Sequence, residues 1–147
     1  MSKKLIYLYV IAVLILIFSV LLLARHHDAI SSPVTTHINL VGEVDKIGDK
    51  VHLIYALCAN GGLLLISLFF VLKPQYANYP FEITDENRAS SYQKMRFFLL
   101  ILCIITSISF NYMILKAINA SHLFIYVISS TAFFAFMVSR YCGTVRS

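Results

Sequence analysis

The chain has 147 residues, of which 59% are hydrophobic and only 13% are charged, and its formal net charge is +5. A water-soluble fold of this size has no interior large enough to bury so much apolar surface. The twelve Lys and Arg residues are scattered between hydrophobic runs, whereas a nucleic-acid interface gathers them into a stripe. Composition therefore excludes an ordinary soluble domain, argues against a nucleic-acid partner, and predicts a single membrane domain over 1–147 whose solvent is the lipid bilayer.

Four apolar runs contain no Asp, Glu, Lys or Arg, and a helix needs about 20 such residues to cross the hydrocarbon core. The predicted spans are 5–24, 52–72, 97–115 and 123–139. The first run is longer than the apolar core of a signal peptide and is followed by a poor cleavage site, so we expect a retained anchor. The pattern predicts an all-α fold, an integral membrane four-helix bundle.

The basic residues between the spans predict the orientation, because cytoplasmic segments are enriched in Lys and Arg. With the N-terminus inside, the cytoplasmic segments contain eight of the twelve, namely Lys3, Lys4, Lys73, Arg88, Lys94, Arg96, Arg140 and Arg146. The outer segments then contain the other four, Arg25, Lys46, Lys50 and Lys116. We therefore expect a multi-pass membrane protein with both termini in the cytoplasm.

The segment between the first two spans is the densest polar region of the chain. Within it, apolar and β-branched residues alternate at the period of a β-strand, at Val34, Thr36, Ile38 and Leu40. Gly42 and Gly48 permit turns that residues with a Cβ disfavour. We expect a structured extracellular loop, either a short hairpin or a cap over the outer helix ends.

Histidines and carboxylates in this loop suggest one alternative, because zinc takes three or four nitrogen or oxygen ligands. The candidate ligands are His26, His27, His37 and Asp45. No compact zinc spacing such as HExxH is present, and none of the three cysteines belongs to a CxxC pair. We expect no metal and no cofactor; on this interpretation the loop is simply folded, with His37 hydrogen-bonded inside it.

Several polar residues near the midpoints of the spans have similar predicted depths, namely Asn60, Thr106, Ser107, Ser129 and Ser130. They would either line a substrate path or join the helices by hydrogen bonds. No Asp, Glu, Lys or Arg lies inside any predicted span, and buried charge is the usual mark of a proton- or ion-coupled carrier. The packing role is therefore the expected one.

The loop before the third span contains a helix start signal. Thr84 is a suitable N-cap, and Asp85 and Glu86 follow in the first turn, where the helix dipole favours negative charge. We expect a helix to begin there and to continue into the third span.

Two blocks of residues carry a family resemblance. The first is Pro33, Thr36-His37-Ile38-Asn39 and Gly42-Glu43-Val44-Asp45-Lys46-Ile47-Gly48-Asp49-Lys50. The second is Pro74-Gln75-Tyr76-Ala77-Asn78-Tyr79-Pro80, continuing through Ile83-Thr84-Asp85-Glu86-Asn87 to Tyr92. In their order and position these blocks resemble a bacterial membrane domain of unknown function that also forms the N-terminal part of SdpI-type toxin-immunity proteins.

The resemblance implies a non-enzymatic binding or signalling protein of the bacterial cytoplasmic membrane, related to toxin immunity. Its implied partners are an extracellular peptide and a cytoplasmic regulator or another membrane protein. The recognition loop would be shaped by His37, Asn39, Gly42, Asp45, Gly48 and Lys50. Three alternatives remain: these residues only fold the loop, the chain is a structural or assembly subunit of a larger membrane complex, or it is a metal-dependent membrane enzyme.

Overall fold

The computed structural model describes residues 3–39 and 43–119, together with positions 125, 128, 129 and 132. In chain order its elements are α1 (Lys3–His26), η1 (His27–Ala29), β1 (Val34–Ile38), β2 (Val44–Gly48), α2 (Val51–Leu72), η2 (Pro74–Tyr76) and α3 (Arg88–Ala117). The fold is mostly helical, but β1 and β2 form a small antiparallel sheet. The all-α prediction is corrected to this extent, because the alternating segment after the first span forms true strands.

Three helices, α1, α2 and α3, are long and apolar enough to cross a membrane. The predicted span 5–24 lies within α1, the span 52–72 within α2 and the span 97–115 within α3. The predicted fourth span, 123–139, lies outside the described residues except for four positions, which are helical. A bundle of three such helices is therefore described, and the fourth helix stays a prediction.

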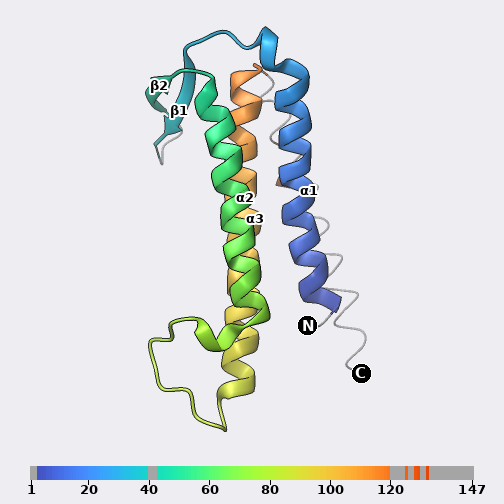
Figure 1. Cartoon of the computed structure of the whole chain (residues 1–147), viewed down its shortest axis with the longest axis vertical. Helices are drawn as coiled ribbons and strands as arrows, with labels where there is room; N and C mark the ends of the chain where they lie inside the picture. Colours follow the sequence, from blue (N-terminus) through green and yellow to red (C-terminus); the bar gives the residue numbers. More distant parts are fainter. Residues whose placement is uncertain (1–2, 40–42, 120–124, 126–127, 130–131, 133–147) are drawn as a thin grey trace.

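The third helix packs against both of the others, whereas α1 and α2 touch each other less. Figure 1 shows α1 and α2 side by side with α3 behind them. The sheet and η1 lie at one end of the helices, which we call the hairpin end. The segment 73–87, which joins α2 to α3, lies at the other, the loop end (Figure 1).

The buried side chains of α1 recur every three or four residues, at Leu5, Leu8, Ile11, Ala12, Ile15, Ser19 and Leu23. This spacing places them on one face of the helix. Ala12 and Ser19 are fully buried, and small residues at such positions let helix backbones approach closely. Large apolar side chains such as Leu21 and Leu65 are more than half exposed, which suits helices whose outer faces contact lipid.

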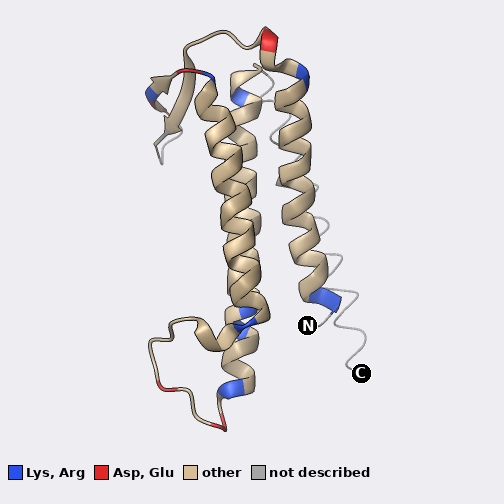
Figure 2. Ribbon diagram, in the orientation of Figure 1, with Lys and Arg blue, Asp and Glu red and all other residues tan. Residues whose placement is uncertain are grey.

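The charged residues gather at the two ends of the described helices, with none along their middle sections (Figure 2). The helix α2 begins at Val51, whose backbone N–H donates a hydrogen bond to Oδ1 of Asp49 at 2.8 Å. It ends at Leu72, just before Pro74, because proline cannot continue a helix. Charged and helix-breaking residues thus fix the limits of the apolar segment.

The start of α3 differs from the prediction. The helix begins at Arg88 rather than directly after Thr84. The backbone N–H of Thr84 donates to Oδ1 of Asn87 at 3.0 Å, and the N–H of Asn87 donates to the Thr84 hydroxyl at 3.4 Å. These reciprocal bonds close a turn of the capping-box type, so regular helix begins one turn later. From Arg88 it continues unbroken for 30 residues, as predicted.

Candidate functional site

The hairpin of β1 and β2 contains most of the residues predicted to shape the recognition loop. The paired positions are Val34 with Gly48, Thr35 with Ile47, His37 with Lys46, and Ile38 with Val44. The register is irregular on both sides of His37. Irregularities of this kind re-aim a side chain and increase the local twist, so His37 lies where the ladder departs from regular alternation. The predicted hairpin is confirmed.

An exposed hydrogen bond joins the two strands through His37 and Asp45. The Nδ1 atom of His37 lies 2.5 Å from Oδ1 of Asp45, and the two side chains are 59% and 43% exposed. This hydrogen bond from His37 lowers the pKa of the Asp45 carboxyl below its ordinary value of 3.8. Because a carboxylate only accepts hydrogen bonds, Nδ1 carries the proton, and in the neutral ring the lone pair then lies on Nε2. The pair presents a polarised imidazole to the surroundings.

A second polar pair closes the far end of the hairpin. The backbone N–H of Asn39 donates to the carbonyl of Glu43 at 2.9 Å. In return the N–H of Glu43 donates to Oδ1 of Asn39 at 2.9 Å, and Nδ2 of Asn39 donates to the Glu43 carboxylate at 3.3 Å. Asn39 therefore shapes the turn, while Gly42, predicted in the same turn, lies outside the described residues.

Gly48 and Lys50 hold the base of the hairpin to the helix ends. A Cβ at Gly48 would lie 2.9 Å from Cγ2 of Thr36 and 3.3 Å from Nδ1 of His52. The lack of a side chain at Gly48 thus allows the side chains of Thr36 and His52 to approach its backbone closely. The sequence had instead suggested that this glycine permits a turn. The ammonium of Lys50 donates to the carbonyl of His27 at 3.2 Å, so this lysine ties the start of α2 to η1.

The strand β1 is anchored in the helix bundle by its first residue. Val34 is 4% exposed and belongs to a buried cluster with Leu23, Ile30, Leu53, Leu57 and Ile114. This cluster joins all three helices to the segment between η1 and β1. The prediction of a cap over the helix ends therefore holds for this segment, in addition to the hairpin that follows it.

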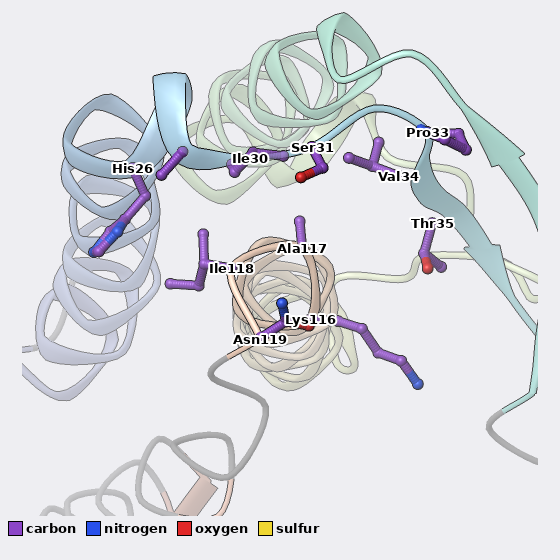
Figure 3. A pocket seen from close by; sticks show the side chains of 11 residues that line it. His26, Ile30, Ser31, Pro33, Val34, Thr35, Lys116, Ala117, Ile118 and Asn119 are labelled. Carbon is purple, nitrogen blue, oxygen red and sulfur yellow. The ribbon is translucent and has the colours of Figure 1, made fainter.

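A cavity of about 400 Å³ lies between this segment and the end of α3. Figure 3 shows Ile30 and Ser31 on one side of it and Ala117 and Ile118 facing them from α3. Thr35 borders the cavity from the hairpin. The other lining residues are His26, Ala29, Pro33, Val34, Lys116 and Asn119.

The contribution of the α3 end to this cavity was missed by the sequence reasoning. Asn119, two residues beyond the end of α3, has a left-handed conformation with a φ of 56°, which asparagine tolerates better than most residues. The available signal was Lys116, a cation in the last turn of a predicted helix. Nothing in the sequence places that turn beside β1.

At the loop end, aromatic residues fold back on the start of α3. The Tyr79 hydroxyl donates to the carbonyl of Pro74 at 2.9 Å, and its ring contacts Phe81 and Tyr92. Burial raises the pKa of this hydroxyl, and Tyr92 adds to the rise. A cavity of about 200 Å³ lies here, lined by Tyr79, Pro80, Phe81, Ser91, Lys94, Met95 and Phe98.

The polar residues within the predicted spans form two buried contacts. The Ser107 hydroxyl donates to Oδ1 of Asn60 at 3.2 Å, joining α3 to α2. The Nδ2 atom of Asn111 donates to the Ser19 hydroxyl at 2.7 Å, joining α3 to α1. All four side chains are fully buried, so the geometry agrees with the packing interpretation.

Thr106, another member of the predicted polar band, bonds within its own helix. The Thr106 hydroxyl donates to carbonyls of its own helix, at Leu102 and Cys103. Ser129 is described as exposed, whereas Ser130 lies outside the described residues. Ser19 and Asn111 were missed. Asn111 follows Ser107 by one helical turn, a spacing that puts both on one face and was visible in the sequence.

Among the described residues, no group of three or more His, Cys, Asp or Glu side chains is placed to hold a metal ion. No family model matches the chain, and comparison with curated proteins and with solved structures found no match.

Proposed function

We propose that this chain is a non-enzymatic membrane binding protein with a signalling role, in which the hairpin recognises a ligand. The observation that supports this proposal is the exposed His37–Asp45 pair, held at 2.5 Å on strands that are anchored in the bundle by Val34. Recognition groups held before the ligand arrives lose less conformational entropy on binding. The hairpin thus has the properties of a preorganised binding surface.

The proposed orientation places the hairpin end outside the cell. Among the described residues, six Lys and Arg lie towards the loop end and four towards the hairpin end, and cytoplasmic segments carry such an excess. The membrane would be the bacterial cytoplasmic membrane, with the N-terminus and the C-terminus inside.

The proposed ligand is an extracellular peptide, as the resemblance to SdpI-type proteins suggests. The cavity of about 400 Å³ beside β1 has apolar walls from Ile30 and Ile118, and the cation Lys116 lies at its border. An acidic or C-terminal carboxylate of a peptide would suit that cation. At the loop end, the cavity of about 200 Å³ lies next to Lys94 and the exposed ring of Phe81 and would receive a cytoplasmic regulator.

The test is photocrosslinking in living cells, with the photoreactive residue placed at Ile47 on β2. Ile47 is 66% exposed, and Leu65, which is 68% exposed and lies inside the apolar helix α2, provides a matched control. Cells are exposed to peptides secreted by neighbouring bacteria. We expect the Ile47 probe to capture a secreted peptide, the Leu65 probe to capture lipid, and His37→Ala to abolish the peptide product.

Two results would contradict the proposal. One is a peptide product that His37→Ala and Asp45→Ala leave unchanged. The other is a stoichiometric crosslink from Ile47 to another membrane protein, which would instead support the structural or assembly subunit. A strain that lacks the protein supplies an independent readout, because immunity requires that its sensitivity to at least one secreted toxic peptide increase.

A further inference from the structure

A third cavity, separate from the two described above, lies between α1 and α2. It has a volume of about 420 Å³ and is lined by Leu16, Val20, Leu23, Ala24, His27, Ile54, Leu57 and Cys58. It occupies the half of the bundle nearer the hairpin end, where α1 and α2 lie side by side with α3 behind them (Figure 1). Because α1 and α2 touch each other less than either touches α3, their facing surfaces leave a groove.

The dimensions of the groove fit a single hydrocarbon chain. From Leu16 to His27 it follows α1 for eleven residues, which at about 1.5 Å per residue is about 16 Å, close to half of a hydrocarbon core of about 30 Å. Dividing the volume of about 420 Å³ by this length gives a cross-section of about 26 Å². A groove of this length and volume has room for a narrow, linear apolar group that lies along α1.

The polarity of the groove changes along its length in the way that a lipid requires. Its walls are aliphatic apart from the Cys58 thiol, and its one ionisable ring, His27, lies where α1 has ended. The Lys50 ammonium lies 3.2 Å from the His27 carbonyl and retains two further N–H donors. The apolar groove therefore ends at His27, whose carbonyl accepts a hydrogen bond from Lys50, although Lys50 itself does not line the groove.

We propose that this groove binds one acyl chain of a phospholipid from the leaflet at the hairpin end, with the lipid phosphate held by Lys50. The acyl chain lies along Val20 and Leu57, and the phosphate lies at the level of His27. Lys50 then contacts both the lipid and the base of the hairpin, so the bound lipid braces η1 against α2. This inference does not depend on the ligand proposed for the hairpin.

The proposal is tested by native mass spectrometry of the full chain in mild detergent, after addition of dipalmitoyl phosphatidylglycerol. Val20 lines the groove and is 45% exposed, while its neighbour Leu21 is 62% exposed and does not line it. We expect wild type to retain one lipid per chain. Val20→Trp should lower this occupancy about tenfold or more, and Leu21→Trp should leave it near the wild-type level.

Two further variants test separately the apolar walls of the groove and the polar end where the phosphate is held. Cys58→Phe fills the groove from α2 and should also lower the lipid occupancy. This second variant keeps the proposal testable if Val20→Trp does not fold. Lys50→Gln should lower retention of the phospholipid about fivefold, whereas Lys46→Gln on β2 should not change it. The proposal is overturned by equal loss in the Val20 and Leu21 variants, by no retained lipid in wild type, or by a second copy of the chain in its place. Unchanged retention in Lys50→Gln would overturn the assignment of the phosphate.

Discussion

Two pairs of side chains in this protein form hydrogen bonds of similar length but differ in burial, and therefore in what the bond contributes to the protein. The contact between His37 and Asp45 is exposed to solvent, where a hydrogen bond between side chains adds little to the stability of the fold. The contact between Ser19 and Asn111 is fully buried between two helices, where neither group has water as an alternative partner. The first pair therefore matters for the chemistry of the surface, and the second for the arrangement of the helices.

The exposed pair predicts a change in the titration of Asp45. Its pKa lies below 3.8 because His37 donates a hydrogen bond to the carboxylate. A lowered carboxyl pKa stabilises the folded hairpin above the unfolded pKa, and this contribution is lost as the pH falls through the folded value. In His37→Ala, we expect the Asp45 pKa to rise towards 3.8, as measured by NMR of its carboxyl carbon against pH. An unchanged Asp45 midpoint in His37→Ala would show that the hydrogen bond is not formed.

The buried pair predicts energetic coupling between α1 and α3. A double-mutant cycle with Ser19→Ala and Asn111→Ala should give a coupling of about 0.5–1.5 kcal/mol, the range typical of hydrogen bonds between membrane helices. Unfolding free energies in mixed micelles provide the measurement. Thr106→Ala is the control, because its hydroxyl bonds to its own helix and should not couple to Ser19. Strict additivity of Ser19→Ala and Asn111→Ala would argue against the contact.

Among the elements, those set by local pattern were predicted from the sequence. Uninterrupted apolar runs identified α1, α2 and α3, because crossing hydrocarbon demands a minimum length. Alternation from Val34 onwards identified β1. The limits of elements were less certain: α3 starts at Arg88 rather than after Thr84, because Asn87 bonds back to Thr84 and continues the turn.

Contacts between elements were harder to predict, because they depend on how each helix is rotated. Asn60 and Ser107 were grouped by depth, and the structure joins them. Thr106, adjacent to Ser107, was grouped with them as well, but a difference of one residue turns a side chain by about 100° around the helix. The meeting of Lys116 with β1 depends on the paths of several segments, which no local pattern specifies.

The close packing at Gly48 leads to a prediction about the hairpin as an element. In Gly48→Ala, the new Cβ would lie 2.9 Å from Cγ2 of Thr36, so that side chain must shift. We expect the hairpin to lose about 1 kcal/mol, which corresponds to about fivefold faster hydrogen exchange of its strand amides. Adding Thr36→Ser removes the Cγ2 atom and should restore most of the protection. No rescue by Thr36→Ser would mean that another contact limits the space at Gly48.

At the scale of the whole molecule, α3 holds the other two helices in place. It bonds to α1 through Asn111 and to α2 through Ser107. Nearer the loop end, the Arg96 side chain donates to the carbonyl of Val71 at 2.9 Å, which satisfies a carbonyl that the end of α2 leaves without a helical partner. Both α1 and α2, which border the groove, are thus bonded to α3.

This arrangement predicts that the hairpin and the 73–87 segment lie on opposite sides of the membrane, because a single apolar helix, α2, separates them. In a background with all three cysteines replaced, Lys46→Cys and Glu86→Cys each provide one thiol on an exposed position. With the hairpin outside, a membrane-impermeant maleimide should label the Lys46 variant in intact cells. It should label the Glu86 variant only after permeabilisation, and labelling of both after permeabilisation is the control for thiol reactivity. The reverse pattern would keep the three-helix arrangement and invert the orientation. Labelling of both variants in intact cells would show that α2 does not cross the bilayer, because only a spanning α2 shields one thiol while leaving the other accessible.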